Sequence, residues 1–400
     1  MIPVKIAGFR ESRKAIATLL GYLEEKGIDY PVTPVILKNK QKPEINEGEV
    51  LSISFLSIRW KEIKTLIEEV KGKVSMLIAG GPHPAGRWKE LLDSGFDIVA
   101  TGEGEESFTG IIELLQGKRE IEEVPGICYK INGNVKCNEQ HRLTSLDQSP
   151  GFSIRHRIFP SIEVTRGCPY LCQYCQTPVL MGRRPRHRSM EDLERIVKFY
   201  LEIGKKDFRF ITPNAFGYLD SSPNDWLPFV SMVKMLYRAV RGKGRLFIGS
   251  FPSEVRPDYV TPEKVETVKK FCANDNIVVG AQSGSNRILK KMKRAHTVED
   301  VIRAVKIIVD NGLTANVDFI FGNPGEEEED IEATIELMEK LIEMGAKIHG
   351  HYFMPLPGTP WENEKPVIWP KKYIRKLGEM ARRGLLYGSW THQMKFTEIV

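Results

Sequence analysis

The stretch IEVTRGCPYLCQYCQ, residues 162–176, joins a short β-branched run to a dense group of cysteines. Cys168, Cys172 and Cys175 fall within eight positions. Thiolates are soft ligands that bind zinc and iron–sulfur clusters. A closed structural zinc site takes four protein ligands. Because this stretch offers three, it predicts a metal centre with one position left for another ligand.

Two interpretations of the missing ligand stay open at the level of the residues. His187, twelve residues after Cys175, would complete a zinc site. The other interpretation is a [4Fe–4S] cluster held by three cysteines, with one iron open to a substrate or cofactor. Cys128, Cys137 and Cys272 are isolated in the sequence and supply no second close pair.

Short apolar runs alternate with segments of helical period after the cysteines, which is typical of β/α units. Such units predict an incomplete (β/α)6 barrel, whose active site lies at the carboxyl ends of the strands. The cysteines follow the first of these strands, where this architecture places chemistry. The six candidate strands are IEVTRG (162–167), FRFIT (208–212), RLFIG (245–249), NIVVGA (276–281), ANVDFIFG (315–322) and KIHGHYFMP (347–355).

The preceding region shows the same alternation and predicts a Rossmann-like parallel α/β sheet. Its apolar runs end in GGPHP (80–84) and TGEGEE (101–106), and loops at the carboxyl ends of parallel strands line the ligand crevice of such sheets. VPGICYKINGNVKC (124–137) predicts a hairpin with an Asn-Gly turn.

We expect three parts along the chain: residues 1–150, residues 151–360 and residues 361–400. The third part contains PKKYIRKLGEMARRG (370–384), which predicts a basic amphipathic helix followed by an irregular aromatic end.

The composition is that of a globular protein. The chain has 400 residues, 41% of them hydrophobic, and a formal net charge of +6. The sequence shows no apolar run near the roughly 18 residues that span a bilayer and no signal-peptide core, so we expect a soluble protein without membrane contact. Sparse cysteines grouped like metal ligands indicate a reducing cytoplasm. The basic run GRRPRHR (182–188) faces either an anionic ligand or solvent.

The Cys-x3-Cys-x2-Cys spacing, with Tyr174 before the last cysteine, resembles the signature of radical S-adenosylmethionine enzymes. The resemblance implies a [4Fe–4S] cluster whose open iron is chelated by S-adenosylmethionine, which explains the missing ligand. GAQSGSNRILKKMKRAHTVEDV (280–301), VDFIFGNPGE (317–326) and FMPLPGTP (353–360) resemble the methylthiotransferase branch and radical enzymes with cobalamin domains.

The resemblance implies cofactor contacts around the barrel. Gln282 and Ser283 would lie on its floor, and Arg294 would bind the carboxylate of S-adenosylmethionine, since a guanidinium suits a planar carboxylate. The alternative for Arg294 is a surface charge at a helix end. Family members often carry Gly-Gly-Glu after the second strand; this chain has ITPNAF (211–216) instead. Further expected contacts are Thr212 and Asn214 as stand-ins, Ser250, Glu254 and Arg256 after the third strand, and Gly322, Pro324 and Pro355 after later strands.

The N-terminal region resembles the cobalamin-binding domains of such enzymes. Its SISFLS stretch (52–57), the GGPHP loop and FDIVATGEGEESF (96–108) carry the likeness, although the Asp-x-His-x-x-Gly element that supplies a histidine to cobalt is absent. The domain therefore either binds cobalamin without that ligand or has lost it. The expected contacts are Ser54, Leu56, Gly80, Gly81, Gly102 and Glu103, with His83 either near the cofactor or capping a turn.

The resemblance implies a radical enzyme that depends on an electron donor such as ferredoxin or flavodoxin. We expect methyl transfer to an unactivated carbon or phosphinate centre. The alternatives are methylthiolation of RNA or protein, a cobalamin-free radical reaction that makes a carbon–carbon bond or a rearrangement, and a zinc-stabilised module that binds RNA. His351 and Tyr352, at the end of the last strand, are the expected catalytic residues; Tyr218, Trp226 and His349 are further positions that would meet substrate or pack.

Overall fold

The computed structural model describes residues 1–39 and 41–397, and these divide into two compact units. The first unit contains Met1–Pro160, with the segments Gln176–Arg186 and Leu356–Thr359. The second contains Ser161–Cys175, His187–Pro355 and the described residues from Pro360 onward. The cysteine-rich loop therefore belongs to the second unit.

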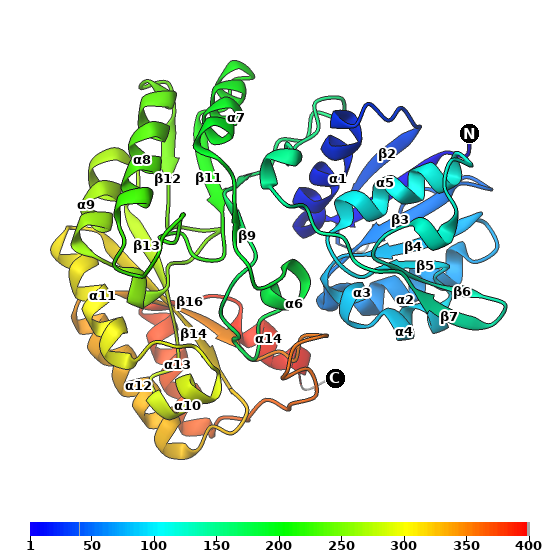
Figure 1. Ribbon diagram of the computed structural model, residues 1–400. Helices are drawn as coiled ribbons and strands as arrows, with labels where there is room; N and C mark the ends of the chain where they lie inside the picture. Colours follow the sequence, from blue (N-terminus) through cyan, green and yellow to red (C-terminus); the bar gives the residue numbers. More distant parts are fainter. Residues whose placement is uncertain (40, 398–400) are drawn as a thin grey trace. The chain divides into compact units, whose positions relative to one another are not determined.

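The first unit is a sheet with strand order β2-β1-β3-β4-β5-β6-β7 within the described residues (Figure 1). Strands β1 to β5 pair in parallel, and β6 and β7 add an antiparallel hairpin. The strands are β1 Val4–Phe9, β2 Val32–Leu37, β3 Val50–Ser54, β4 Met76–Gly80, β5 Ile98–Ala100, β6 Ile127–Ile131 and β7 Asn134–Cys137. The helices are α1 Arg13–Glu25, α2 Trp60–Val70, α3 Pro82–Gly86, α4 Trp88–Ser94, α5 Gly104–Leu115 and α6 Thr177–Met181, with short 3-10 helices η1 Arg10–Ser12, η2 Ser57–Arg59, η3 Ile121–Glu123 and η4 Leu146–Gln148.

Two apolar layers hold this sheet, as expected for parallel strands that helices cover on both faces. Residues of α1 and α5 pack on one face, and residues of α2 and α4 pack on the other (Figure 1). Strand β3 is buried along its whole length. The order 2-1-3-4-5 is that of flavodoxin-like sheets, whose ligand crevice opens between the first and third strands. The predicted Rossmann-like sheet is confirmed.

The predicted hairpin is confirmed as β6 and β7. Its turn residues, Asn132 and Gly133, have φ values of 50° and 78°, as an Asn-Gly turn of this type requires. Cys128 and Cys137 lie opposite each other in the strand register and form a disulfide. The interpretation of these two cysteines as isolated is therefore wrong, because the hairpin brings together residues nine positions apart.

The second unit has two main parallel sheets, β12-β11-β8 and β13-β14-β15-β16, in the part of the chain that is described. A single bridge, Val255 to Val279, links the region after β12 to β13. The six expected runs all form strands, but the first is split into β8 and β9. The strands are β8 Ile162–Glu163, β9 Thr165–Arg166, β10 Arg186–His187, β11 Asp207–Ile211, β12 Arg245–Phe247, β13 Asn276–Gln282, β14 Thr314–Phe321, β15 Lys347–Tyr352 and β16 Leu386–Tyr387.

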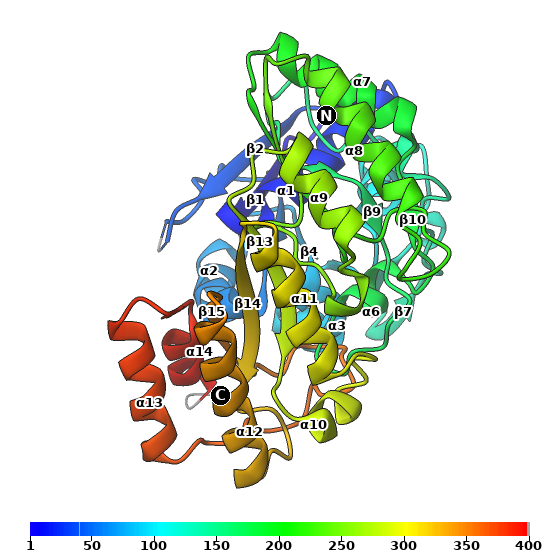
Figure 2. The same ribbon diagram turned by 90° about the vertical axis from the view of Figure 1, so that its left-hand side faces the viewer.

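Helices cover the outer faces of these sheets, and Figure 2 shows α9, α11 and α12 side by side along the barrel strands. Several begin at side-chain caps: Ser189, Thr261 and Thr297 each accept a hydrogen bond from the backbone N–H three positions later. The helices are α7 Met190–Glu202, α8 Leu227–Val240, α9 Pro262–Phe271, α10 Asn286–Lys291, α11 Val298–Asp310, α12 Glu328–Glu343, α13 Lys371–Arg382 and α14 Trp390–Thr397, with the 3-10 helix η5 Pro257–Tyr259.

The last segment of the chain belongs to the barrel unit. The predicted basic helix is confirmed as α13, but the expected irregular end is wrong: β16 pairs in parallel with β15, and α14 follows it. The aromatic residues there fill a packing space, since Trp390 lies edge-on to Phe321.

No helix among residues 1–39 and 41–397 combines the length and apolar character needed to cross a membrane.

Candidate functional site

The cysteine loop leaves β9 through Gly167, whose φ of 87° suits glycine. It then folds onto the end of α10, where the Gln173 N–H donates to the Met292 carbonyl at 3.0 Å and the Cys172 thiol approaches the Lys293 carbonyl at 4.0 Å. Cys172 is buried, whereas Cys168 and Cys175 are partly exposed. Burial raises the pKa of Cys168, and the neighbouring Cys175 and Cys172 raise it further. The three thiols therefore lie within electrostatic reach of one another.

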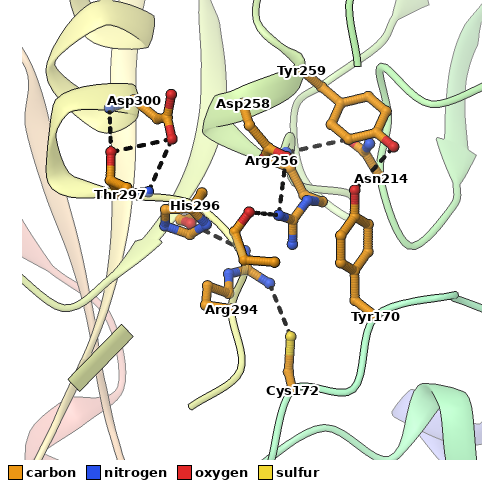
Figure 3. A network of polar contacts seen from close by, with 12 residues as sticks. Tyr170, Cys172, Asn214, Arg256, Asp258, Tyr259, Arg294, His296, Thr297 and Asp300 are labelled. Atoms are coloured by element: carbon orange, nitrogen blue, oxygen red, sulfur yellow. Dashed lines mark hydrogen bonds and ion pairs between the residues drawn. The ribbon is translucent and has the colours of Figure 1, made fainter. Parts of the chain in front are cut away.

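Arg294 is buried beside this loop rather than exposed at a helix end. Its Nη1 lies 3.7 Å from the Cys172 sulfur (Figure 3). Its Nη2 donates to Glu254 Oε1 at 3.2 Å and to the Gly280 carbonyl at 3.0 Å. Burial by itself lowers the pKa of this guanidinium, but Tyr174 and Glu254 hold it above its usual value. The alternative of a surface charge is wrong, and Arg294 is a fixed cation next to the cysteines.

Arg256 supplies a second buried cation. Its guanidinium stacks on the Tyr170 ring at 3.5 Å from the centroid, and its Nη2 donates to Asp258 and to the Ala295 carbonyl (Figure 3). The Tyr170 hydroxyl in turn donates to Tyr259 at 3.0 Å. Tyr170 lies between the first two cysteines, so this stack fixes the cysteine loop against η5.

Several donors of these two arginines have no acceptor within the described residues: Nε of Arg294, and Nε and Nη1 of Arg256. A buried guanidinium N–H without an acceptor is costly. The donor set thus fits an anionic or oxygen-rich group. An S-adenosylmethionine carboxylate next to a three-thiolate cluster is a group of that kind.

Tyr174 packs against an apolar group at the base of the loop: Ile288, Leu289, Met292, Phe353 and Trp361. Burial raises the pKa of its hydroxyl well above the usual value. Tyr174 therefore stays neutral and anchors its part of the loop on this apolar group.

Gln282 and Ser283 follow a bulge at the end of β13. Gln282 adopts φ of 71°, uncommon for a residue other than glycine, and its amide donates to Glu254 Oε2 at 3.3 Å. Ser283 is fully buried, and its hydroxyl accepts from the Ser285 N–H at 3.2 Å at the start of α10. The structure thus joins Gln282, Glu254 and Arg294 in one network, while Ser283 shapes the turn beneath it.

The loop after β11 contains Thr212 and Asn214, and the loop after β12 contains Ser250. The Thr212 hydroxyl donates to the Asn214 carbonyl at 3.0 Å, and Asn214 Oδ1 accepts from the Arg256 backbone N–H at 3.2 Å. Ser250 lies 3.4 Å from Arg209 Nη1. Thr212 and Asn214 also line a small cavity at the carboxyl ends of these strands. Asn214 reaches the cysteine region through Arg256.

The later loop residues, Gly322, Pro324 and Pro355, are buried or half-buried. Gly322 has φ of 73°, and a Cβ there would lie 2.7 Å from the Tyr352 ring. Pro324 is buried and Pro355 is half-buried.

Histidines and an aspartate share one face of β14 and β15. Asp318 lies opposite His349 in the register, and the two side chains are 2.9 Å apart, from Oδ1 to Nδ1. His351, two residues on, lies on the same face with its ring 4.5 Å from that of His349. Burial raises the pKa of Asp318 to about 6 and lowers that of His351 to about 4. Glu254 also acts electrostatically on both groups, so this face lies near the Arg294 network.

Tyr352 does not join its neighbour His351. The strand period turns it to the opposite face, where it is buried and its hydroxyl donates to the Val367 carbonyl at 2.7 Å. This geometry favours a packing role over the expected catalytic one. Tyr218 is likewise buried, with its hydroxyl on the Arg188 carbonyl at 2.8 Å, and Trp226 is half-buried at the start of α8.

The basic run is engaged in contacts within each unit. Arg186 forms an ion pair with Glu103, and Arg188 forms one with Asp192. His187, the alternative zinc ligand, lies 2.9 Å from the Thr165 hydroxyl. Glu103 is thus occupied by a guanidinium in the first unit.

The remaining expected residues of the first unit surround the carboxyl ends of β3 to β5. Gly81 has φ of 100° and packs against Ser54 and Phe55, whereas a Cβ on Gly80 would meet only Ala100, at 4.0 Å. A Cβ on Gly102 would meet Gln140, and Leu56 is half-buried before η2. The Ser12 hydroxyl donates to the Ser54 carbonyl at 2.7 Å and ties the first loop to the third strand.

His83 is buried in α3, with Nδ1 3.0 Å from the Ser57 hydroxyl and its ring packed against Phe55 and Trp60. Its Nε2 has no partner within the described chain, and burial lowers its pKa to about 4. The His83 ring therefore packs in its neutral form. Its Nε2 makes no hydrogen bond within the described chain that would cap a turn.

Sequence reasoning did not identify four residues of the site: Asp318, His296, Tyr170 and Gly280. Asp318 carries a signal, because a carboxylate inside the apolar run VDFIF is unusual. His296 lies next to the arginines, with Nε2 3.2 Å from the Ala281 carbonyl (Figure 3). Gly280 and Tyr170 act through close packing, which a sequence pattern does not reveal.

Residues 162–338, which contain the cysteine loop and most of this network, match the Radical SAM superfamily. This part of the chain is a radical SAM domain.

The chain is similar to a curated tRNA-modifying enzyme and to two solved structures of radical S-adenosylmethionine enzymes. A tRNA-2-methylthio-N(6)-dimethylallyladenosine synthase of Buchnera aphidicola subsp. Schizaphis graminum is 26% identical over 370 residues, covering 88% of this chain and 78% of that one. The cobalamin-dependent S-adenosylmethionine radical enzyme OxsB, with aqua-cobalamin and S-adenosylmethionine bound, has 18% identity and a TM-score of 0.64 over 84% of this chain. The radical S-adenosylmethionine methyltransferase TsrM from Kitasatospora setae, with cobalamin and a [4Fe–4S] cluster bound, has 15% identity and a TM-score of 0.68, covering 90% of this chain and 77% of that one. The match spans about half of OxsB, 52%. At these identities the two structures establish a shared fold.

Proposed function

We propose that Cys168, Cys172 and Cys175 hold a [4Fe–4S] cluster and that S-adenosylmethionine takes the open coordination position. When bound, these groups supply a reducing electron and a 5′-deoxyadenosyl radical that takes hydrogen from an unactivated carbon. The observation that carries the proposal is the pair of buried arginines beside three thiols that form no disulfide, because these arginines have N–H groups without an acceptor among the described residues.

Arg294 is the group that we assign to the carboxylate of S-adenosylmethionine. Glu254 and the Gly280 carbonyl hold its Nη2, so its Nε is left to donate outward. Because the guanidinium is fixed before the ligand arrives, little side-chain entropy is lost on binding. Tyr170, stacked on Arg256, holds the loop in shape.

We further propose that the first unit binds cobalamin and that the reaction is methyl transfer to an unactivated centre. Support comes from the fold shared with OxsB and TsrM, and from the open space beside Gly80 at the carboxyl edge of β4. Cobalamin carries a methyl group on cobalt when bound. The loop after β1 offers no histidine, since it reads GFRESRK, so the proposal is a cobalamin without a histidine from that loop.

Methylthiolation of RNA or protein is the second candidate, because the Buchnera relative is a tRNA methylthiotransferase. It requires a source of sulfur. Cysteines before residue 161 are Cys128 and Cys137, and these form the hairpin disulfide, so the first unit offers no three-thiol set for a second cluster. This favours methyl transfer. A soluble one-electron donor such as ferredoxin or flavodoxin would reduce the cluster in either case.

The first test is the iron and cobalt content of protein purified without oxygen from cells supplied with hydroxocobalamin. We expect about four irons and one cobalt per chain, with reductive cleavage of S-adenosylmethionine. The triple variant Cys168→Ala, Cys172→Ala, Cys175→Ala should lose iron and cleavage while keeping cobalt and the circular dichroism spectrum.

Each outcome of this test has a separate meaning. The variant Cys272→Ala is the matched control, because that thiol is half-buried away from the loop and should leave iron unchanged. Four irons without cobalt would contradict the cobalamin proposal but not the cluster assignment. Iron or cleavage retained in the triple variant would contradict the cluster assignment.

A further inference from the structure

Asp318, His349 and His351 form a compact group that the proposed cluster and cofactor sites do not use. One carboxylate oxygen and one nitrogen from each ring all lie within 4.8 Å of one another. Asp318 is buried, and the two histidines are half-buried. Two imidazoles and one carboxylate on one face are a common ligand set for Zn²⁺ and Fe²⁺.

The strands fix this arrangement. His349 and His351 point to one face because they are two residues apart on β15, and the register of β14 sets Asp318 opposite His349. On the other face, a Cβ at Gly350 would lie 2.8 Å from the Phe321 ring, so that side is filled. Tyr387 stacks on the His349 ring at 4.7 Å and limits its rotation. A site on strands of a packed sheet is held more precisely than one on loops.

The group faces the interior side of the barrel strands. Ile320 lies opposite His351 in the register and packs with Tyr174 against the same apolar group at the base of the cysteine loop. Glu254, the partner of Arg294, acts electrostatically on both Asp318 and His351. The three side chains therefore lie on the face where a substrate of the radical chemistry would bind.

We propose that Asp318, His349 and His351 form a mononuclear site for a borderline divalent transition metal of the Zn²⁺ or Fe²⁺ class. Three protein ligands leave coordination positions open, as in catalytic rather than structural zinc sites. An open position binds a substrate oxygen or nitrogen and holds the substrate against the barrel. Metal binding stands independently of the proposed function, whereas this use in substrate binding rests on it.

The test is zinc binding to the full-length protein with its iron in place, after removal of loosely held metal with a chelator. Titration calorimetry with Zn²⁺ and metal analysis should give one zinc per chain. The variants His349→Ala, His351→Ala and Asp318→Asn should each weaken zinc binding at least about tenfold, because loss even of an outer-shell partner costs about 10–100-fold. Iron content and circular dichroism should stay at wild-type values.

His141→Ala is the matched control, since His141 also lies beside a carboxylate, Glu106, but on an exposed surface of the first unit. The cysteine triple variant separates the two assignments: it should lose iron and keep the zinc that depends on His349. Wild-type protein that binds no zinc, or zinc binding unchanged in the variants of all three ligands, would overturn the proposed site and show an ordinary hydrogen-bonded Asp–His pair.

Discussion

Gly280 sets how closely the Arg294 network can approach the end of β13. A Cβ at this position would lie 2.5 Å from Arg294 Nη2 and 2.7 Å from Glu254 Oε2. Contacts this short force the side-chain ends apart, while the buried strand beneath stays in place. The glycine therefore controls the geometry of the proposed carboxylate site without being a ligand.

The variant Gly280→Ala should weaken S-adenosylmethionine binding by about tenfold or more, which corresponds to a lost charge-assisted hydrogen bond. Binding is measured by equilibrium dialysis on protein with its iron counted. Gly378→Ala in α13 is the control, because a Cβ there would meet no atom of the described residues within 4 Å. Unchanged affinity together with unchanged iron would contradict the role assigned to Arg294.

His296 gives the site a predictable dependence on pH. Burial, together with the nearby charges of Arg294 and Arg256, lowers its pKa from the ordinary 6.5 to about 2. Between these limits the unfolded chain binds a proton at this residue and the folded chain does not. The free energy of unfolding should therefore fall as the pH drops below 6.5, with a slope that approaches about 1.4 kcal/mol per pH unit from this residue.

The measurement is urea unfolding at several pH values between neutral and mildly acidic conditions. His296→Gln keeps a donor for the Ala281 carbonyl but does not titrate, so its unfolding free energy should depend less steeply on pH than that of wild type. His141→Gln, at an exposed position, should match wild type. Equal slopes for His296→Gln and wild type would show that His296 is not a buried neutral ring.

The sequence identifies residues whose type and spacing indicate a known chemistry. It does not identify residues that reach the site only because of the fold. The three cysteines and Arg294 stand out in the sequence because their spacing and charge resemble a known signature, and the structure places Arg294 beside Cys172. Asp318 could not be paired with His349, since that pairing depends on the register between β14 and β15. The separation of Tyr352 from His351 could not be read from the sequence either, because a strand presents alternate residues to opposite faces.

At the scale of elements, long strands such as Thr314–Phe321 could be predicted, because they contain more apolar and β-branched residues than a loop of that length usually does. The very short strands could not be predicted from the sequence. The first barrel run splits into β8 and β9, each two residues long, and β16 is also two residues long. Such short strands have no period to detect, and tertiary pairing alone creates them.

The aromatic packing of α14 makes the C-terminal segment part of the barrel. Trp390 is buried against Phe321 and against the backbone at Gly350. Trp390→Ala should lower the free energy of unfolding of the barrel unit by about 3–5 kcal/mol, because it leaves a large cavity. Denaturant unfolding monitored on the barrel unit checks this, with the exposed Thr391→Ala as control; a loss below about 1 kcal/mol would mean that α14 packs loosely.

On the scale of the whole molecule, the described chain comprises two α/β units. The radical SAM domain carries the cysteines, the buried arginines and the Asp–His group. The first unit presents a flavodoxin-like strand order with open space at Gly80. The alternation of strands and helices made both units predictable. The first unit also contains two segments from the barrel part of the sequence, Gln176–Arg186 and Leu356–Thr359. No sequence pattern indicates that these segments belong to the first unit.

The pairing of β16 with β15 has a consequence for how the protein is made. Residues 353–385 separate these strands, so a ribosome completes β15 well before its parallel neighbour emerges. During that interval β15 is an uncovered edge with unpaired backbone groups, the kind of surface on which nascent chains associate. Synthesis at high levels should therefore favour aggregation at this step, and slower translation of residues 353–385 would prolong the exposure.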